Sequence, residues 1–165
     1  MHLILVTLHI MKSHISYLLA VVGTAALSSS VLFGGAVVSG FDSSSLPAND
    51  DGSTGLVAFG LSGPLNFSGT HYSGAYLNNN GNMTFGAALS IFTPFGITGG
   101  SIPMIAPFFA DVDTRTGPLM QFGNGTFDGH AAFGQTGREV GYYSEHLEHR
   151  NTFQTLLVDR SDVAA

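Results

Sequence analysis

The segment Ile105–Arg115, IAPFFADVDTR, changes within a few positions from an apolar run to alternating acidic residues. The apolar part is typical of a chain that enters a buried strand. Alternation with a period of two then places Asp111 and Asp113 on one side of an extended segment and Val112 on the other. Carboxylates held at a sheet edge can bind an arginine, backbone N–H groups or a cation. The segment therefore predicts a strand around which a β domain assembles.

The composition also favours β structure. The chain has 165 residues, enough for one domain with a hydrophobic core. Only 10% of its residues are charged, and it contains 22 glycines and 13 phenylalanines, which suits tight turns and aromatic packing. Cysteine is absent, so there is no disulfide framework, as in many bacterial exported proteins. We expect an all-β, sandwich-like domain of short antiparallel strands.

The charge distribution bears on the partners. The formal net charge is −6, and Lys12 is the only charged residue before Asp42. An acidic surface argues against nucleic acid as a partner, because phosphate binding needs clustered Lys and Arg. No basic amphipathic stretch predicts binding to a membrane surface.

Residues 1–40 form a hydrophobic N-terminal segment that predicts a secretory signal peptide. With Met11 as the true start, Lys12 and His14 precede the apolar run ISYLLAVVGTAAL. Cleavage after Ser30 or after Ala36 would place small residues at the required positions, and the sequence does not choose between them. The apolar run upstream, Met1–Ile10, is interpreted as an over-extended translation start.

A retained transmembrane helix is the alternative for this segment. Ile15–Gly40 contains no charged residue, and about 20 residues suffice to span a bilayer. The Ser and Gly content of its second half favours cleavage. In both cases the segment is expected to be helical, the domain is exported, and membrane contact is confined to this segment if it stays uncleaved.

Residues 41–165 are predicted to form the β domain. Asn80-Gly81 is the strongest turn signal and predicts a type I′ hairpin. Asp50-Asp51-Gly52 is interpreted as a solvated turn, in preference to a Ca²⁺ loop, because the spaced acidic pattern of such loops is missing. Strands are expected at 56–59, 65–67, 72–77, 83–85, 119–122, 140–143 and 151–159.

Asp111 and Asp113 are the best candidates for a functional site. A structural role, in a turn and paired with Arg115, is favoured, Ca²⁺ binding is the second interpretation, and acid–base catalysis is the third. The chain has no G-x-S-x-G nucleophile elbow and no phosphate loop, so we do not expect an enzyme. Glu145–His149, EHLEH, is interpreted as a solvated turn in preference to a metal site, because it lacks the H-E-x-x-H spacing of zinc proteases.

Four separated motifs resemble the nidogen-like (NIDO) domain. They are LNNNGNMTFG (77–86), IAPFFADVDTR (105–115), VGYYSEH (140–146) and NTFQTLLVDRSD (151–162), in this order and spacing. The resemblance covers about residues 41–162. It implies an extracellular, non-catalytic module of the kind found in matrix and adhesion proteins, here resembling bacterial exported proteins with a single such domain. The family has no established catalytic residues to carry over.

Two departures from the family pattern affect the expected fold. The family places a Trp shortly before the V-G-Y-Y motif, and this chain has none, so Phe133 is the candidate to replace it. The family also continues past the D-R-S-D motif, whereas this sequence stops at Ala165. We therefore expect a C-terminally truncated domain in which the strand ending at Asp159 has no partner or an exposed edge.

These observations predict a secreted or cell-surface module for adhesion to an extracellular protein or polysaccharide. The alternative is a carbohydrate-binding module of an exopolysaccharide-associated protein, for which Tyr72, Tyr76, Tyr142 and Tyr143 would supply exposed aromatic rings. The expected core includes Phe109, Val112, Tyr142 and Phe153, and the turn Asn78–Asn82 is expected to be exposed.

Overall fold

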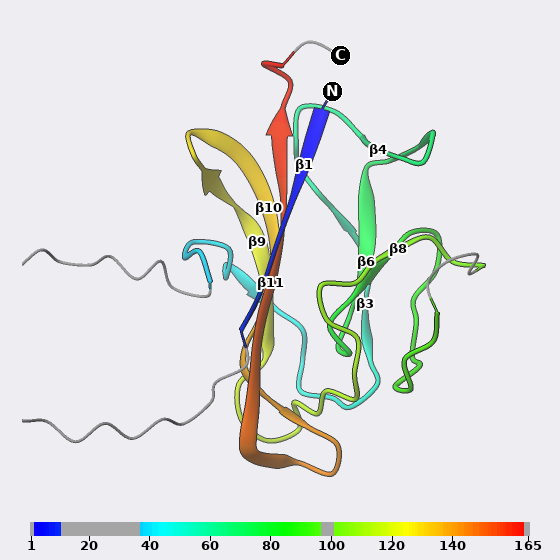
Figure 1. Ribbon diagram of the computed structural model, residues 1–165, viewed down its shortest axis with the longest axis vertical. Coiled ribbons are helices and arrows are strands. Elements are labelled where there is room, and N and C mark those ends of the chain that lie inside the picture. Colours follow the sequence, from blue (N-terminus) through cyan, green and yellow to red (C-terminus); the bar gives the residue numbers. More distant parts are fainter. Residues whose placement is uncertain (1, 11–36, 97–100, 164–165) are drawn as a thin grey trace, which may run out of the picture.

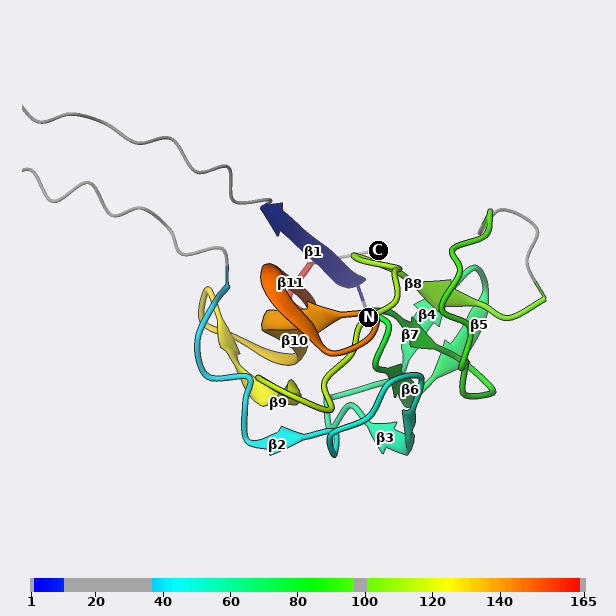
Figure 2. The ribbon, with the colours of Figure 1, turned by 90° about the horizontal axis from the view of Figure 1, so that it is seen from below.

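The computed structural model describes residues 2–10, 37–96 and 101–163. Its strands form a five-stranded sheet of order β1-β11-β10-β9-β2, a four-stranded sheet of order β3-β6-β7-β8, and the small hairpin β4-β5. Figures 1 and 2 show the two larger sheets as separate layers, which confirms the all-β, sandwich-like fold. The strands are β1 (His2–Ile10), β2 (Ser44–Ser45), β3 (Ser53–Ala58), β4 (Leu65–Phe67), β5 (Thr70–Tyr72), β6 (Gly74–Asn78), β7 (Met83–Thr84), β8 (Met104–Ile105), β9 (Met120–Phe127), β10 (His130–Tyr142) and β11 (His146–Arg160).

The main core fills the space between the two sheets. Phe59 contacts Phe133 with ring centroids 5.4 Å apart, and both rings are buried. Phe133 thus lies in the main core. Residues of both sheets complete this cluster, including Leu77, Met83, Ile105 and Leu157.

A second cluster lies at one end of the sandwich, around Val112 and Phe153. The Phe153 ring stacks on Phe108 and also packs against Gly137 of β10, where an added Cβ would lie 2.5 Å from a ring carbon. Val112 and Phe153 are buried as predicted, whereas Phe109 and Tyr142 are only half-buried. Tyr142 lies near the end of β10, where the chain leaves the sandwich, so its ring is not covered on both sides.

The segment Ile105–Arg115 is not the long strand that its apolar run predicts. Only Met104–Ile105 forms a strand, β8, and the chain then continues without ladder pairing. Pro107 has no N–H to donate to a ladder. The N–H groups of Ala110 and Thr114 bond to asparagine carbonyls, and the backbone of Val112 bonds to the side chains of Asn79 and Asn80. The segment is nonetheless central, because it passes through the interior at the end of the sandwich.

The expected hairpin at Asn80-Gly81 is present, with a different turn. β6 pairs antiparallel with β7, and Leu77 lies opposite Met83. Gly81 adopts a φ of 89°, but Asn80 is not in the left-handed region, so this is a longer loop and not a type I′ turn. The strands expected near 119–122, 140–143 and 151–159 are also present but much longer, as β9, β10 and β11.

The strand that ends at Arg160 has a neighbour on each side. β11 pairs with β10 and, along its other edge, with β1, where His2 lies opposite Arg160 and Ile10 opposite Thr152. Figure 1 shows β1 lying along β11 at the edge of the sheet. The prediction of an unpaired strand was therefore wrong, because the apolar segment at the start of the chain has the β-forming composition that the edge requires.

Residues 2–10 are thus a strand and not part of a helix, which corrects the expected helical conformation for this part of the segment. The predicted signal-peptide run and its two cleavage sites lie at 11–36, outside the described residues. Within the described part of the chain, no helix has the length and apolar character needed to cross a bilayer.

Candidate functional site

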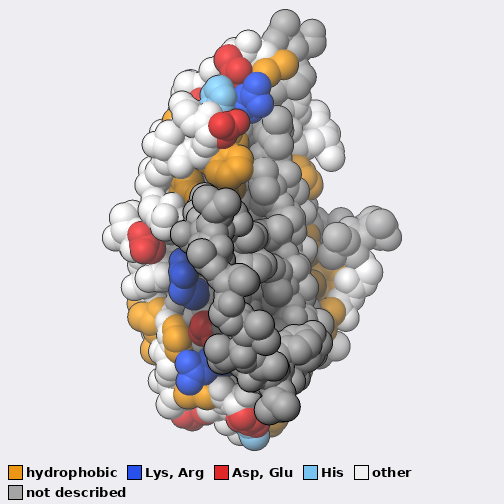
Figure 3. Space-filling view, turned by 60° about the vertical axis from the view of Figure 1, so that its left-hand side comes forward, with side chains coloured by type: hydrophobic (Ala, Val, Ile, Leu, Met, Phe, Trp, Pro, Cys, Tyr) orange, Lys and Arg blue, Asp and Glu red, His pale blue; other side chains and the backbone are white. Residues whose placement is uncertain are grey.

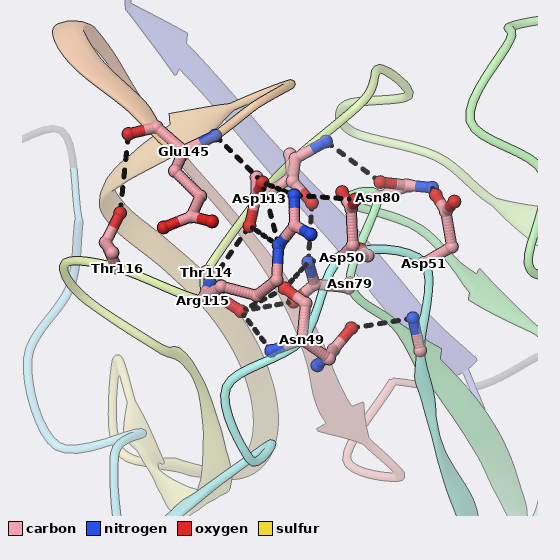
Figure 4. A network of polar contacts seen from close by, with 12 residues as sticks. Asn49, Asp50, Asp51, Asn79, Asn80, Asp113, Thr114, Arg115, Thr116 and Glu145 are labelled. Atoms are coloured by element: carbon pink, nitrogen blue, oxygen red, sulfur yellow. Dashed lines mark hydrogen bonds and ion pairs between the residues drawn. The ribbon is translucent and has the colours of Figure 1, made fainter.

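The residues with the densest polar contacts lie at one end of the sandwich, where three chain segments meet (Figure 4). The β6–β7 loop contributes asparagines, the turn before β3 contributes Asp50 and Asp51, and the segment after β8 contributes Asp111 and Asp113. This end contains the candidate residues that the sequence singled out, together with residues that it assigned to a simple turn.

The asparagines of the β6–β7 loop are buried, contrary to prediction. The exposed fractions of Asn78, Asn79, Asn80 and Asn82 are 0%, 0%, 1% and 0%. Their side-chain amides form hydrogen bonds that backbone groups form in a regular sheet. The Asn79 Nδ2 group donates to the carbonyls of Asp50 (2.7 Å) and Val112 (2.6 Å). Although its composition is typical of a solvated turn, this loop is buried. Its asparagine side chains can form hydrogen bonds with backbone groups of other segments.

The same loop fixes the segment that carries Asp111 and Asp113. The Asn80 Oδ1 atom accepts a bond from the Val112 N–H (2.9 Å), and the Thr114 N–H donates to the Asn49 carbonyl (2.8 Å). The Asn80 Nδ2 group also donates to the Asp51 carboxylate (2.8 Å). The backbone between Ala110 and Thr114 is therefore held in place without a β ladder.

Asp113 is bound by Arg115. The side chain of Asp113 is fully buried, and its two carboxylate oxygens accept bonds from the Arg115 Nε atom at 3.0 and 3.1 Å and a further bond from Nη2. The Glu145 N–H donates to the same carboxylate at 2.9 Å. Hydrogen bonds from Arg115 are the main reason that the pKa of Asp113 lies below its ordinary value. This is the structural role that the sequence favoured for Asp113.

Asp111 lies in a different group, with Asp50 and Asp51. One carboxylate oxygen of each residue lies within 4.8 Å of the others, and all three side chains are half-buried. Burial, followed by the neighbouring carboxylates, raises the pKa of Asp111, and burial also raises that of Asp50. Carboxylate oxygens are the ligands that Ca²⁺ prefers. The sequence paired Asp111 with Asp113, whereas the fold brings Asp111 to the turn at Asp50-Asp51.

The two groups share Asp50. Its Oδ2 atom lies 3.0 Å from the Arg115 guanidinium, which also holds Asp113, while its Oδ1 atom is buried without a hydrogen-bond partner among the described residues. The positive charge of Arg115 is therefore shared between Asp113 and Asp50. The carboxylates of Asp50, Asp51 and Asp111 lie beside this pair and repel one another.

The EHLEH segment, Glu145–His149, begins in the turn between β10 and β11 and continues into β11, which starts at His146. Ser144 and Glu145 adopt left-handed backbone, as tight turns require. The Glu148 carboxylate accepts a bond from the Tyr142 hydroxyl (2.7 Å) and lies 2.6 Å from the His146 Nδ1 atom. These bonds, that of Tyr142 first, lower the pKa of Glu148 to about 2. The predicted turn is thus confined to the residues before His146, and His146–His149 form the largely exposed start of β11 with local hydrogen bonds.

The four tyrosines considered for sugar binding do not share a surface. Tyr72 of β5 stacks on Phe85 with ring centroids 4.6 Å apart, and Tyr76 lies on β6 of the four-stranded sheet. Tyr142 and Tyr143 lie at the other sheet, and among the four only Tyr143 is highly exposed (64%). No common aromatic platform is assembled from them.

Comparison with known proteins identifies a family to which part of the chain is similar. Residues 73–123 match the model of the nidogen-like domain family (NIDO). Alpha-tectorin of Mus musculus is 43% identical over 68 residues, and that of Homo sapiens is 41% identical over 68 residues. In both cases the alignment covers 40% of this chain and 3% of the relative, so the chain spans a very small part of these proteins. No solved structure matches the chain.

The resemblance to the nidogen-like domain predicted from the sequence is therefore confirmed. The matched residues include the motifs at 77–86 and 105–115, which form the asparagine-rich loop and the segment that carries Asp111 and Asp113. The motifs at 140–146 and 151–162 lie outside the match. In the structure they form the β10–β11 hairpin that packs against the matched part.

Proposed function

We propose that the chain is an exported, non-catalytic module that mediates adhesion at the cell surface or in the extracellular matrix. The observation that carries this proposal is the nidogen-like match over residues 73–123, since the resemblance implies an extracellular module of matrix and adhesion proteins. The polar network at the end of the sandwich supports a structural role for most of its members, because their side chains bond to backbone groups of other segments.

The contact surface for an extracellular protein is assigned to the loop after β7. This loop lies inside the matched segment and exposes the large side chains of Ile91 (44%), Phe92 (50%) and Phe95 (40%). It is anchored to the buried loop, because the Asn80 Nδ2 group donates to the Ile91 carbonyl at 3.2 Å. Exposed aromatic and aliphatic side chains on an anchored loop are typical of protein–protein contact sites.

Bead adhesion tests this proposal. Beads coated with the full chain are expected to be retained on a surface coated with basement-membrane extract, and not on one coated with albumin. The variant I91S/F92S should lower retention at least about fivefold, since interface energy is concentrated in few residues. V163S, which removes an exposed side chain (41%) far along the chain, is the matched control. Equal retention on both surfaces, or equal loss in V163S, would contradict the proposal.

A carbohydrate-binding module is the second candidate function. The tyrosines proposed for it from the sequence do not form one surface, so Tyr143→Ala is expected to leave retention on a polysaccharide unchanged. A different surface, on the five-stranded sheet, has the chemistry that this function needs.

A further inference from the structure

A solvent-open groove of about 590 Å³ lies on the five-stranded sheet. It is formed by β2, the start of β9, the irregular part of β10 and the start of β11. Its lining includes two arginines, Arg138 and Arg150, and also Glu139, Gln121, Pro118 and Leu119. None of these residues belongs to the polar network described above.

A β-bulge shapes this groove. The register between β10 and β11 shifts between Gly137 and Val140, so that Arg138 and Glu139 together face Thr152. Glu139 has a φ of 53°, which is uncommon for a residue with a side chain, and its N–H donates to the Thr152 hydroxyl at 3.0 Å. Bulges re-aim side chains next to binding sites, and this one directs two charged residues to the groove lining.

The two arginines of the groove differ from the others in their partners. Arg115 is paired with Asp113, and Arg160 is paired with Asp162. In the described part of the chain, neither Arg138 nor Arg150 forms an ion pair with a carboxylate, and both are exposed. Arg150 is nonetheless oriented, because its Nε atom donates to the Leu147 carbonyl at 3.1 Å.

We propose that this groove binds an acidic polysaccharide through the carboxylate of a uronic acid unit. The guanidinium groups of Arg138 and Arg150 can each bind a carboxylate by two hydrogen bonds. Gln121 offers an amide for sugar hydroxyls. Pro118 and Leu119 supply an apolar surface for the face of the ring. The proposal rests on the extracellular location inferred above, and it gives the carbohydrate-binding alternative a site and a ligand class.

Non-specific attraction of a polyanion does not explain this site, because the formal net charge of the chain is −6. Among the described residues visible in Figure 3, the basic side chains lie singly, with acidic, hydrophobic and uncharged side chains near them. Recognition would therefore depend on the two groove arginines and not on the overall field. This distinguishes a uronate site from a surface for polyanions in general.

The test measures binding of the full chain to immobilised polygalacturonate, in chelator so that Ca²⁺ bridges are excluded. R138Q/R150Q is expected to lower the affinity at least tenfold, while R160Q, which removes an arginine outside the groove, leaves it within twofold. Neutral dextran should not bind. Both groove arginines are exposed, so the thermal midpoint of the double variant should match that of the wild type, which excludes unfolding as a cause.

Three results would overturn the inference. The first is absence of wild-type binding to polygalacturonate, and the second is an equal loss of affinity in R160Q and R138Q/R150Q. The third is that poly-glutamate displaces the chain from polygalacturonate as efficiently as galacturonate oligomers do, which would indicate a site for acidic peptides. Bead adhesion to basement-membrane extract is measured on the same preparations. If the wild type adheres to the extract but does not bind polygalacturonate, only the groove proposal is excluded. If I91S/F92S loses adhesion but still binds polygalacturonate, the loop after β7 and the groove are independent binding surfaces.

Discussion

Asp113 and Arg115 lie two residues apart and form a bidentate ion pair. The Asp113 carboxylate is fully buried, and the Arg115 side chain is 45% exposed. The pair joins the inside of the sandwich to its surface. It also connects to the β10–β11 turn through the Glu145 N–H, and to the turn before β3 through Asp50. Several loops at this end of the molecule therefore depend on a single arginine.

This dependence predicts the effect of Arg115→Gln. The variant leaves the Asp113 carboxylate buried without its cation, so the free energy of unfolding should fall, by less than for a fully buried pair because Arg115 is 45% exposed. D113N/R115Q should recover part of that loss, because the buried charge is then absent as well. Urea unfolding of the wild type, both single variants and the double variant gives the coupling directly. Additive losses would show that the pair is not coupled.

The pKa shifts of four aspartates predict a stability maximum at mildly acidic pH. The pKa values of Asp113 and Asp159 are lowered in the folded chain, so their stabilisation is present above the ordinary value of 3.8 and is lost as the pH falls through the lowered pKa values. The pKa values of Asp50 and Asp111 are raised, so they contribute stability below 3.8 that is lost as the pH rises through the raised values.

Thermal melts by circular dichroism between pH 7 and pH 2 check this sign. The midpoint should rise on mild acidification, as Asp50 and Asp111 take up protons, and fall steeply at lower pH. In Asp111→Asn the rise should be smaller and the steep fall unchanged. A midpoint that falls monotonically from pH 7 in the wild type would contradict the assignment.

The Ca²⁺ interpretation, which the sequence left second to a structural role for Asp111 and Asp113, can be tested on the same melts. If Ca²⁺ binds to the folded chain, it raises the midpoint with concentration. The geometry assigns the ligands to Asp111 with Asp50 and Asp51, and assigns Asp113 to Arg115. The rise should therefore vanish in Asp111→Asn and persist in Asp128→Asn, an exposed aspartate outside the group. Identical wild-type midpoints in Ca²⁺ and in chelator would exclude the site.

The pairing of β1 with β11 predicts a local effect of a proline. Val6 lies opposite Leu156 in the ladder, and Val6→Pro removes an N–H and restricts the strand. Amide hydrogen exchange should quicken along 152–160 while the β9–β10 ladder keeps its protection. Val6→Thr retains the N–H and the β-branched shape, and should leave exchange unchanged. Unchanged exchange in the proline variant would show that β1 does not protect this edge.

Local patterns in the sequence determined much of this protein. Period-two alternation predicts most of the strands from Leu56 onward, Asn80-Gly81 predicts a hairpin between β6 and β7, and the chain motifs predict a nidogen-like domain. Each of these features depends on residues close together in the chain, where backbone preferences and side-chain alternation act directly. The prediction for Asp113 and Arg115 followed for the same reason, since the two residues are neighbours.

Only the tertiary structure decided which distant groups meet. Asn78–Asn82 has the composition of an exposed turn, yet it is buried because its amide partners come from Asn49–Asp51 and from Val112. Asp111 joins Asp50 and Asp51, about 60 positions away, and β1 covers β11 from the opposite end of the chain. Burial and partner choice depend on the free energy of the whole packed arrangement, and no local pattern encodes which buried polar groups will satisfy one another.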